Sequence, residues 1–245
     1  MASDTENESA LTWDYGIVAF LDVLGFSHLV ETDAACPEPL HLRRIVRCLR
    51  SVSSTSTGLL GDIQTFSDSI ILAAPLGVRE LVEVVSVVRA LQRVFINNNL
   101  LLRGAIAFGK HFGGTGITYS QALVAAYHLE RDQARFPRVL LQHDLLSWFA
   151  EQSKGECAQL ECMLLLDRDE RVFVHYLDLE LLPAHATLLS TYERGQLSAS
   201  VLEKAQWLAA YHNHVAPADG SHSLSDSRLV AGFRKVERET YFRLA

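Results

Sequence analysis

The stretch Phe20–Ser27, FLDVLGFS, places one carboxylate at the end of an apolar run and follows it with a glycine. Residues 15–24 form a nearly continuous apolar segment, which is typical of a central buried strand. An unpaired carboxylate in such surroundings costs several kcal/mol, so Asp22 needs a partner. Gly25 allows a sharp turn, and a helix is predicted to start near Ser27.

A second stretch, FSDSIILAAP at 66–75, has the same arrangement, because Asp68 adjoins another apolar run and also needs a partner. Taken alone, Asp22 is equally well explained as a turn residue that caps the following helix, and Asp68 as a hairpin-turn residue. If the two strands are neighbours, their ends bring the two carboxylates together. Close carboxylates repel, and a divalent cation removes that repulsion. Oxygen-only ligands favour Mg²⁺ or Mn²⁺ over zinc.

The turn after Asp22 predicts an anion site. Beyond Gly25, the free backbone N–H groups of Phe26, Ser27 and His28 would open a helix N-terminus. Such N–H groups bind phosphate oxygens. One short stretch therefore offers a metal ligand and a phosphate cradle.

The composition and net charge limit the classes of protein to which this chain can belong. The 245 residues suit one large domain, or one domain with an extension, and 49% apolar residues can bury a sizeable core. The net charge of −7 lacks the basic footprint of a nucleic-acid binder. The polar N-terminus does not resemble a signal peptide, and no apolar run is long enough to span a membrane. Four cysteines without a CxxC pair predict reduced thiols, no zinc site and a cytoplasmic protein.

The pattern along the chain predicts an α+β fold, with helices on one face of a mostly antiparallel sheet, similar to ferredoxin-like palms. We expect a flexible tail over 1–13, a catalytic domain over 14–177 and a helical C-terminal extension over 178–245 that packs on the same domain. KHFGGTG is predicted to be a glycine-rich turn, and Asp144 a helix cap. Strands are predicted at 15–24, at 62–74 with a tight bend near Ser67–Asp68, at 100–109, at 137–141 and as a hairpin within 162–177 with a turn at Arg168–Glu170; helices are predicted at 41–52, 78–95, 120–132, 144–150, 196–213 and 226–243.

With these residues in view, the sequence resembles the class III nucleotidyl cyclases, whose paired metal aspartates match FLDVLGF and FSDSI. It is similar in particular to the pyrimidine cyclases of the Pycsar antiphage system. That resemblance rests on the strand RGA at Arg103–Ala105, the helix ending A-Y-x-LE at Ala126–Glu130, and Q-W-L-x-x-Y-H-N at Gln206–Asn213. It covers about residues 14 to 215.

The resemblance implies conversion of a pyrimidine nucleoside triphosphate, with UTP favoured over CTP, into its 3′,5′-cyclic monophosphate and pyrophosphate. Two Mn²⁺ or Mg²⁺ ions per site would be held by Asp22, Asp68 and the Val23 carbonyl. It also implies a homodimer in which Arg103 faces the metal residues of the other subunit, and a separate effector activated by the product. A nucleotide-binding sensor without turnover and a purine cyclase stay open as alternatives.

Two departures from the wider cyclase class bear on the site. Val124 and His128 stand where many purine cyclases carry a helix asparagine and arginine, so Arg103 is the candidate substitute, against the alternative of a structural salt bridge. Gln64 stands at the purine-selecting lysine position and could bind a pyrimidine edge, or be a surface glutamine. Tyr119 and Tyr127 could stack on a base but are expected in the core, and most of the ten histidines are expected at the surface or as satisfied core residues.

Overall fold

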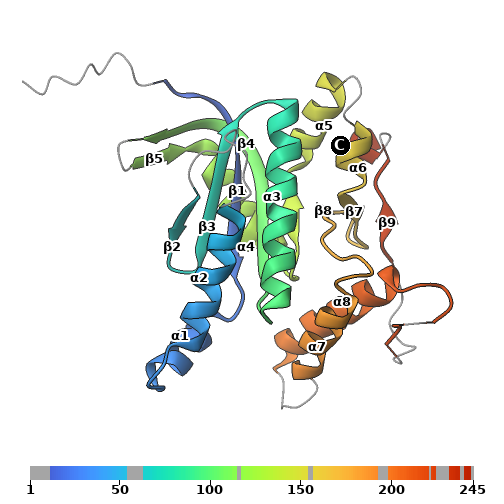
Figure 1. Ribbon diagram of the computed structural model, residues 1–245. Helices are drawn as coiled ribbons and strands as arrows, with labels where there is room; N and C mark the ends of the chain where they lie inside the picture. Colours follow the sequence, from blue (N-terminus) through green and yellow to red (C-terminus); the bar gives the residue numbers. More distant parts are fainter. Residues whose placement is uncertain are drawn as a thin grey trace, which may run out of the picture.

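The computed structural model describes residues 12–53, 63–114, 117–153, 157–192, 198–220, 222–224, 232–237 and 240–243. Its strands form one sheet in the order β2-β3-β1-β4-β6-β8-β7-β9, with β5 paired to β4 (Figure 1). The pairs are antiparallel except β4 with β6, which confirms the mostly antiparallel α+β fold. The strands are β1 Asp14–Val23, β2 Gln64–Phe66, β3 Ser69–Pro75, β4 Leu102–Gly114, β5 Ile117–Ser120, β6 Val139–Leu141, β7 Leu164–Leu166, β8 Val172–Val174 and β9 Arg234–Lys235.

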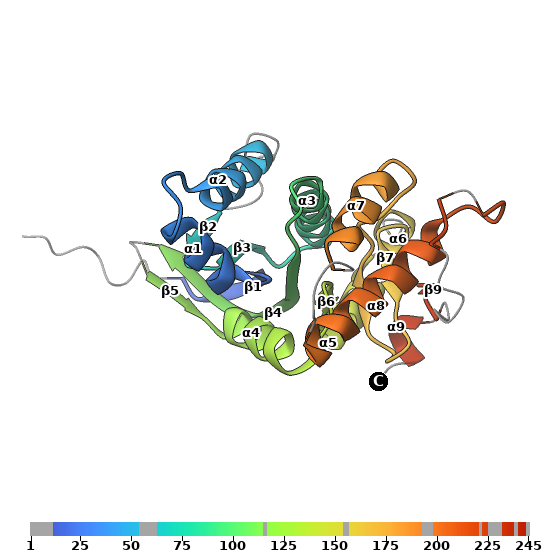
Figure 2. The same ribbon diagram turned by 90° about the horizontal axis from the view of Figure 1, so that it is seen from below.

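Helices cover both faces of the sheet, which corrects the prediction that they would lie on one face. Seen from below, α2 and α3 lie on one side of the strands, and α4 and α8 on the other (Figure 2). The reason lies in β1, where the consecutive residues Ile17, Val18 and Ala19 are all fully buried. The helices are α1 Phe26–Ala34, α2 Leu40–Ser53, α3 Val78–Asn97, α4 Gln121–Gln133, α5 His143–Gln152, α6 Cys157–Glu161, α7 Leu182–Tyr192, α8 Ala199–Val215 and α9 Thr240–Arg243. None of these described helices is both long and apolar enough to cross a membrane.

Strand β1 is central because it pairs with β3 on one side and β4 on the other. Its odd-numbered residues from Ile17 to Val23 join a core with the buried stripe of α3, whose apolar residues recur at the predicted helical spacing. At Gly104 on β4 the two strands come very close, because a side-chain Cβ there would lie 2.3 Å from the Phe20 carbonyl oxygen. A glycine is therefore required at this position.

Three further predictions are wrong. The segment KHFGG continues β4 as far as Gly114, because the four residues His111–Gly114 pair in register with β5; the last two residues of the predicted turn, 115 and 116, lie outside the described residues. Asp144 lies within the first turn of α5, whose N-cap is Gln142. Where the structure describes the predicted helix 226–243, it contains strand β9 and the short helix α9. The tail prediction for 1–13 falls almost wholly outside the described residues.

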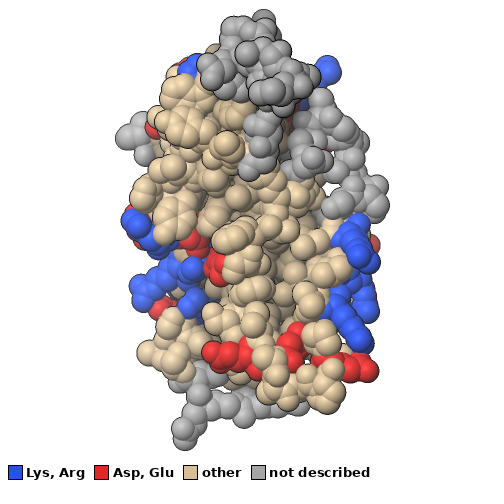
Figure 3. Space-filling model, turned by 90° about the vertical axis from the view of Figure 1, so that its left-hand side faces the viewer, with Lys and Arg blue, Asp and Glu red and all other residues tan. Residues whose placement is uncertain are grey.

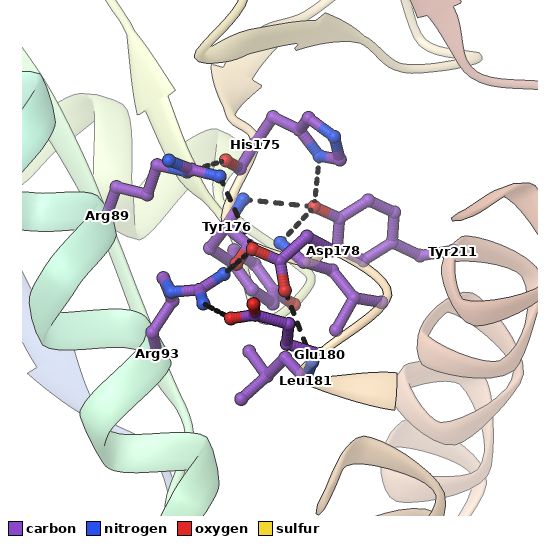
Figure 4. Close-up of polar contacts among 9 residues, drawn as sticks. Arg89, Arg93, His175, Tyr176, Asp178, Glu180, Leu181 and Tyr211 are labelled. Atoms are coloured by element: carbon purple, nitrogen blue, oxygen red, sulfur yellow. Dashed lines mark hydrogen bonds and ion pairs between the residues drawn. The ribbon is translucent and has the colours of Figure 1, made fainter. Parts of the chain in front are cut away.

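A polar network joins the C-terminal helices to the sheet (Figure 4). Arg93 of α3 pairs with Asp178, and Arg89 Nε donates to a carbonyl oxygen of segment 175–178 at 2.8 Å. From the other side, the Tyr211 hydroxyl of α8 accepts two backbone N–H groups of that segment, at 3.1 Å each. The segment is therefore fixed between α3 and α8.

Candidate active site

Asp22 and Asp68 meet where strands β1 and β3 begin to diverge. Asp22 pairs in register with Ser69, and the Val23 N–H donates to the Asp68 carbonyl at 3.0 Å. Asp68 itself lies in the predicted tight turn, after Ser67 with a φ of 56°. Burial raises the pKa of Asp22 to about 6, the positive charge of Arg103 opposes that rise, and a side-chain hydrogen bond with Asp68 adds to it. Two carboxylates separated by 46 residues of sequence therefore lie within hydrogen-bonding reach.

Arg103 of β4 stands directly across from Asp22 in the strand register. Its Nε donates to Asp22 Oδ2 at 3.0 Å, and Glu130 Oε1 of α4 lies 2.6 Å from the same nitrogen. The Glu130 contact is an ion pair without hydrogen-bond geometry, because that oxygen accepts no hydrogen bond among the described residues. Arg103 thus contacts the aspartate of its own chain, whereas the sequence resemblance places it opposite the aspartates of a second subunit.

The helix that follows the site begins without a side-chain cap. Gly25 takes a left-handed conformation, with a φ of 75°, and α1 starts at Phe26. Ser27 is exposed, and Phe26 packs partly against the core. The N–H groups of the first helical turn have no partner within the helix, which makes them available to an anion.

Gln64 lies on the surface of β2, and its Oε1 accepts a hydrogen bond from Thr118 Oγ1 of β5 at 3.0 Å. Val124 and His128 are exposed on α4. Tyr119 and Tyr127 are 66% and 43% exposed, so the prediction that they belong to the core is wrong. Each lies where a partner could reach it.

The donor atoms at the strand ends fit oxygen-preferring ions. Among the described residues, no group of three or more His, Cys, Asp or Glu is arranged to hold a metal. Outside the strand ladders, the Val23 carbonyl accepts no backbone hydrogen bond found in the described part of the chain. Two carboxylates, this carbonyl and water would make up the coordination that Mg²⁺ tolerates, since it keeps several waters in protein sites.

Two residues near the site were not singled out from the sequence. Glu130 is 3% exposed in the last turn of α4, although its neighbour Arg131 is exposed. The pKa of Lys204 on α8 is lowered mainly by burial and further by the positive charge of Arg103. The pair LE at 129–130 drew attention as a family mark, although α4 continues to Gln133, and only tertiary packing shows that the Glu130 carboxylate lies beside Arg103.

No family model matches the sequence, and no curated protein matches it. Among solved structures, the chain is similar to the adenylyl cyclase CyaB from P. aeruginosa at 14% identity and a TM-score of 0.45, over 66% of this chain and 93% of that one. The guanylyl cyclase domain of the RhoGC fusion protein from the aquatic fungus Blastocladiella emersonii matches at 8% identity and a TM-score of 0.45, over 66% and 94%. A class III adenylyl cyclase-like ATP-binding protein from Pseudomonas aeruginosa matches at 10% identity and a TM-score of 0.42, over 74% and 43%. The α+β fold itself follows from the strand order and helix packing given above.

Proposed function

We propose that the protein is a metal-dependent nucleotidyl cyclase that converts UTP into 3′,5′-cyclic UMP and pyrophosphate. One observation carries the proposal: Asp22 and Asp68 lie at adjoining strand ends, close enough for each carboxylate to affect the other, directly before an uncapped helix N-terminus. A pair of carboxylates suits divalent cations, and an uncapped N-terminus suits phosphate. A triphosphate bound with its metals has both requirements.

In this proposal Asp22, Asp68 and the Val23 carbonyl hold two Mg²⁺ or Mn²⁺ ions. Bound ions would supply positive charge that lowers the pKa of the ribose 3′-hydroxyl and neutralises the leaving phosphates. The N–H groups of Phe26 and Ser27 bind phosphate oxygens, and Arg103 offers its guanidinium to the charge that develops in the transition state. The 3′-hydroxyl loses its proton to water, its oxygen forms a bond to the α-phosphorus, the bond from that phosphorus to the bridging oxygen breaks, and pyrophosphate leaves. Positioning and charge neutralisation account for most of the rate.

Pyrimidine choice is assigned to Gln64, whose amide can both donate to and accept from a base edge. Its Oε1 accepts a hydrogen bond from Thr118, and no partner of its amide nitrogen is found among the described residues. A donor favours the uracil O4 over the cytosine amino group, which itself donates. A donor at this position therefore supports UTP over CTP.

We also propose that the protein works as a homodimer and that its cyclic product activates a separate effector in antiphage defence. The side of the molecule that carries α1, α2 and β2 presents an area of uncharged residues with basic side chains at both margins and a band of acidic side chains below it (Figure 3). Phe66 of β2 and Ile117 of β5 are 80% and 61% exposed. Exposed apolar side chains of this size mark association surfaces. The cellular role rests on the sequence resemblance alone.

A nucleotide sensor without turnover is the second candidate. The observation that favours it is the Arg103 contact with Asp22, because a guanidinium there competes with a cation for the carboxylate. The helix positions of Val124 and His128 also lack the asparagine and arginine of many cyclases.

The test is to incubate the purified protein with each of the four ribonucleoside triphosphates and Mn²⁺, and to measure cyclic product and pyrophosphate. We expect UTP turnover that is lost in Asp22→Asn and in Asp68→Asn and kept in Asp14→Asn, since Asp14 is exposed at the far end of β1. CTP turnover would reassign the base, and ATP or GTP turnover would overturn the pyrimidine assignment. Saturable binding without product would establish the sensor. The absence of both binding and product would refute both functions.

A further inference from the structure

Glu130 is a buried carboxylate that the proposed chemistry leaves without a role. Its side chain is 5% exposed, and its only ion pair in the described part of the chain is with Arg103, at 2.6 Å. A buried carboxylate requires a compensating partner, and removing that partner is strongly destabilising. Arg103 is therefore the partner of two acids, Glu130 and Asp22.

The charges of Asp22, Asp68, Glu130 and Arg103 do not balance among these four side chains. Asp22, Asp68 and Glu130 contribute three negative charges and Arg103 one positive charge, which leaves two negative charges when all are ionised. One divalent cation at the two aspartates supplies the missing charge. A cation that engages Asp22 Oδ2 takes the oxygen that now accepts from Arg103, so Arg103 must then rely on another carboxylate.

We infer that Glu130 is a positioning residue that holds the Arg103 guanidinium beside the two aspartates when Asp22 is engaged by a divalent cation. The inference rests on the proposed function for its metal and substrate. With Glu130 present, Arg103 can release Asp22 and still keep one carboxylate partner. With Glu130 neutral, Arg103 has Asp22 as its remaining ion-pair partner and competes with the cation.

The exposed part of the Arg103 side chain also fits an anionic ligand. Its Nε donates to Asp22 and is the nitrogen nearest to Glu130, while 30% of the side chain stays exposed and no hydrogen bond of its terminal nitrogens is found among the described residues. Lys204 of α8 is close enough to Arg103 for the two positive charges to affect each other. Two cations kept near one another by separate elements suit a polyphosphate.

The test is a double-mutant cycle on Mn²⁺ binding, measured by electron paramagnetic resonance on the full chain without nucleotide. We expect Glu130→Gln to weaken Mn²⁺ binding about tenfold when Arg103 is present. Arg103→Met should tighten binding, because the competing cation is gone. Adding Glu130→Gln to Arg103→Met should then change binding by less than about threefold, because Glu130 acts through Arg103.

Equal losses in both backgrounds would overturn the inference, because they would show that Glu130 acts directly on the metal or only supports the fold. Thermal unfolding of each variant separates those two cases. Glu130→Asp keeps the negative charge, so it should bind Mn²⁺ more tightly than Glu130→Gln does. Asp14→Asn is the matched control with unchanged binding. A wild-type chain that does not bind Mn²⁺ would also overturn the inference. If the two substitutions are coupled as expected but the protein turns over no nucleotide, only the proposed function is refuted.

Discussion

Acid should destabilise this protein through histidines that are buried beside α7 and α8. Burial, together with the charge of Arg89, lowers the pKa of His175 to about 4. Burial, together with His212, lowers the pKa of His185 to about 3. The His185 Nδ1 lies 3.1 Å from the His212 Nδ1, so one of the two nitrogens must be a neutral acceptor, and a proton added there would break the contact.

The size of the effect follows from proton linkage. In the unfolded chain a histidine titrates near 6.5, so it takes up a proton between pH 7 and 5, whereas the folded chain does not. A folded pKa below the unfolded value means that stability is present above about pH 6.5 and is lost as the pH falls toward the folded value. Each of the two histidines therefore removes about 2 kcal/mol of unfolding free energy between pH 7 and 5.

Asp22 works in the opposite sense. Its pKa is raised to about 6 in the folded protein, so protonation of the folded state adds stability as the pH falls, by about 1 kcal/mol between pH 7 and 5. The net loss for the three groups is then about 3 kcal/mol. His111, His212 and His214, whose pKa values are also lowered by burial, add to the loss.

The assay is urea unfolding at pH 7, 6 and 5, followed by circular dichroism. His185→Phe should reduce the loss between pH 7 and 5 by about 2 kcal/mol, while His28→Asn, a change at an exposed site on α1, should leave it unchanged. A wild-type unfolding free energy that stays constant over this range would refute the reasoning. It would mean that the native protein already accommodates protonated histidines at these positions.

Three substitutions test the packing that positions the site, each by urea unfolding at pH 7. Gly104→Ala should cost about 2–3 kcal/mol, because the new Cβ would lie 2.3 Å from the Phe20 carbonyl oxygen, and a loss below about 0.5 kcal/mol would contradict the close approach of β1 and β4. Tyr211→Phe should cost about 2–4 kcal/mol, because it leaves two buried N–H groups without their acceptor; a neutral result would show that water replaces the hydroxyl. Arg138→Met should cost about 3–5 kcal/mol, because it removes the guanidinium that pairs with the buried Asp167, and an unchanged midpoint would show that this carboxylate is protonated or solvated.

Much of the fold could be predicted from local patterns. The apolar run of β1, the bend at Ser67–Asp68 and the helical stripe of α3 all lie where the sequence indicates, because each is set by residues close together in the chain. The extent of β4 was missed, since two glycines were interpreted as a turn while strand pairing with β5 keeps Gly113 extended. Helices on the second face were missed because a continuous apolar strand does not reveal what covers each side.

The candidate site divides in the same way. Asp22 and Asp68 could be selected because a carboxylate beside an apolar run is unusual in any single stretch. Glu130 could not, because its burial depends on how α4 packs against β4. The contact between His185 and His212 joins two helices and has no signature in the spacing of either residue.

The position of Arg103 within strand β4 also constrains how the sheet assembles. Side chains alternate between the two faces of a strand, so sliding β4 by one residue against β1 would turn this guanidinium into the apolar layer beneath α3, far from any acid. That arrangement carries a penalty of several kcal/mol, whereas the native alignment gives the cation two anions. The same charged cluster that equips the strand ends for chemistry therefore rejects misaligned sheets during folding.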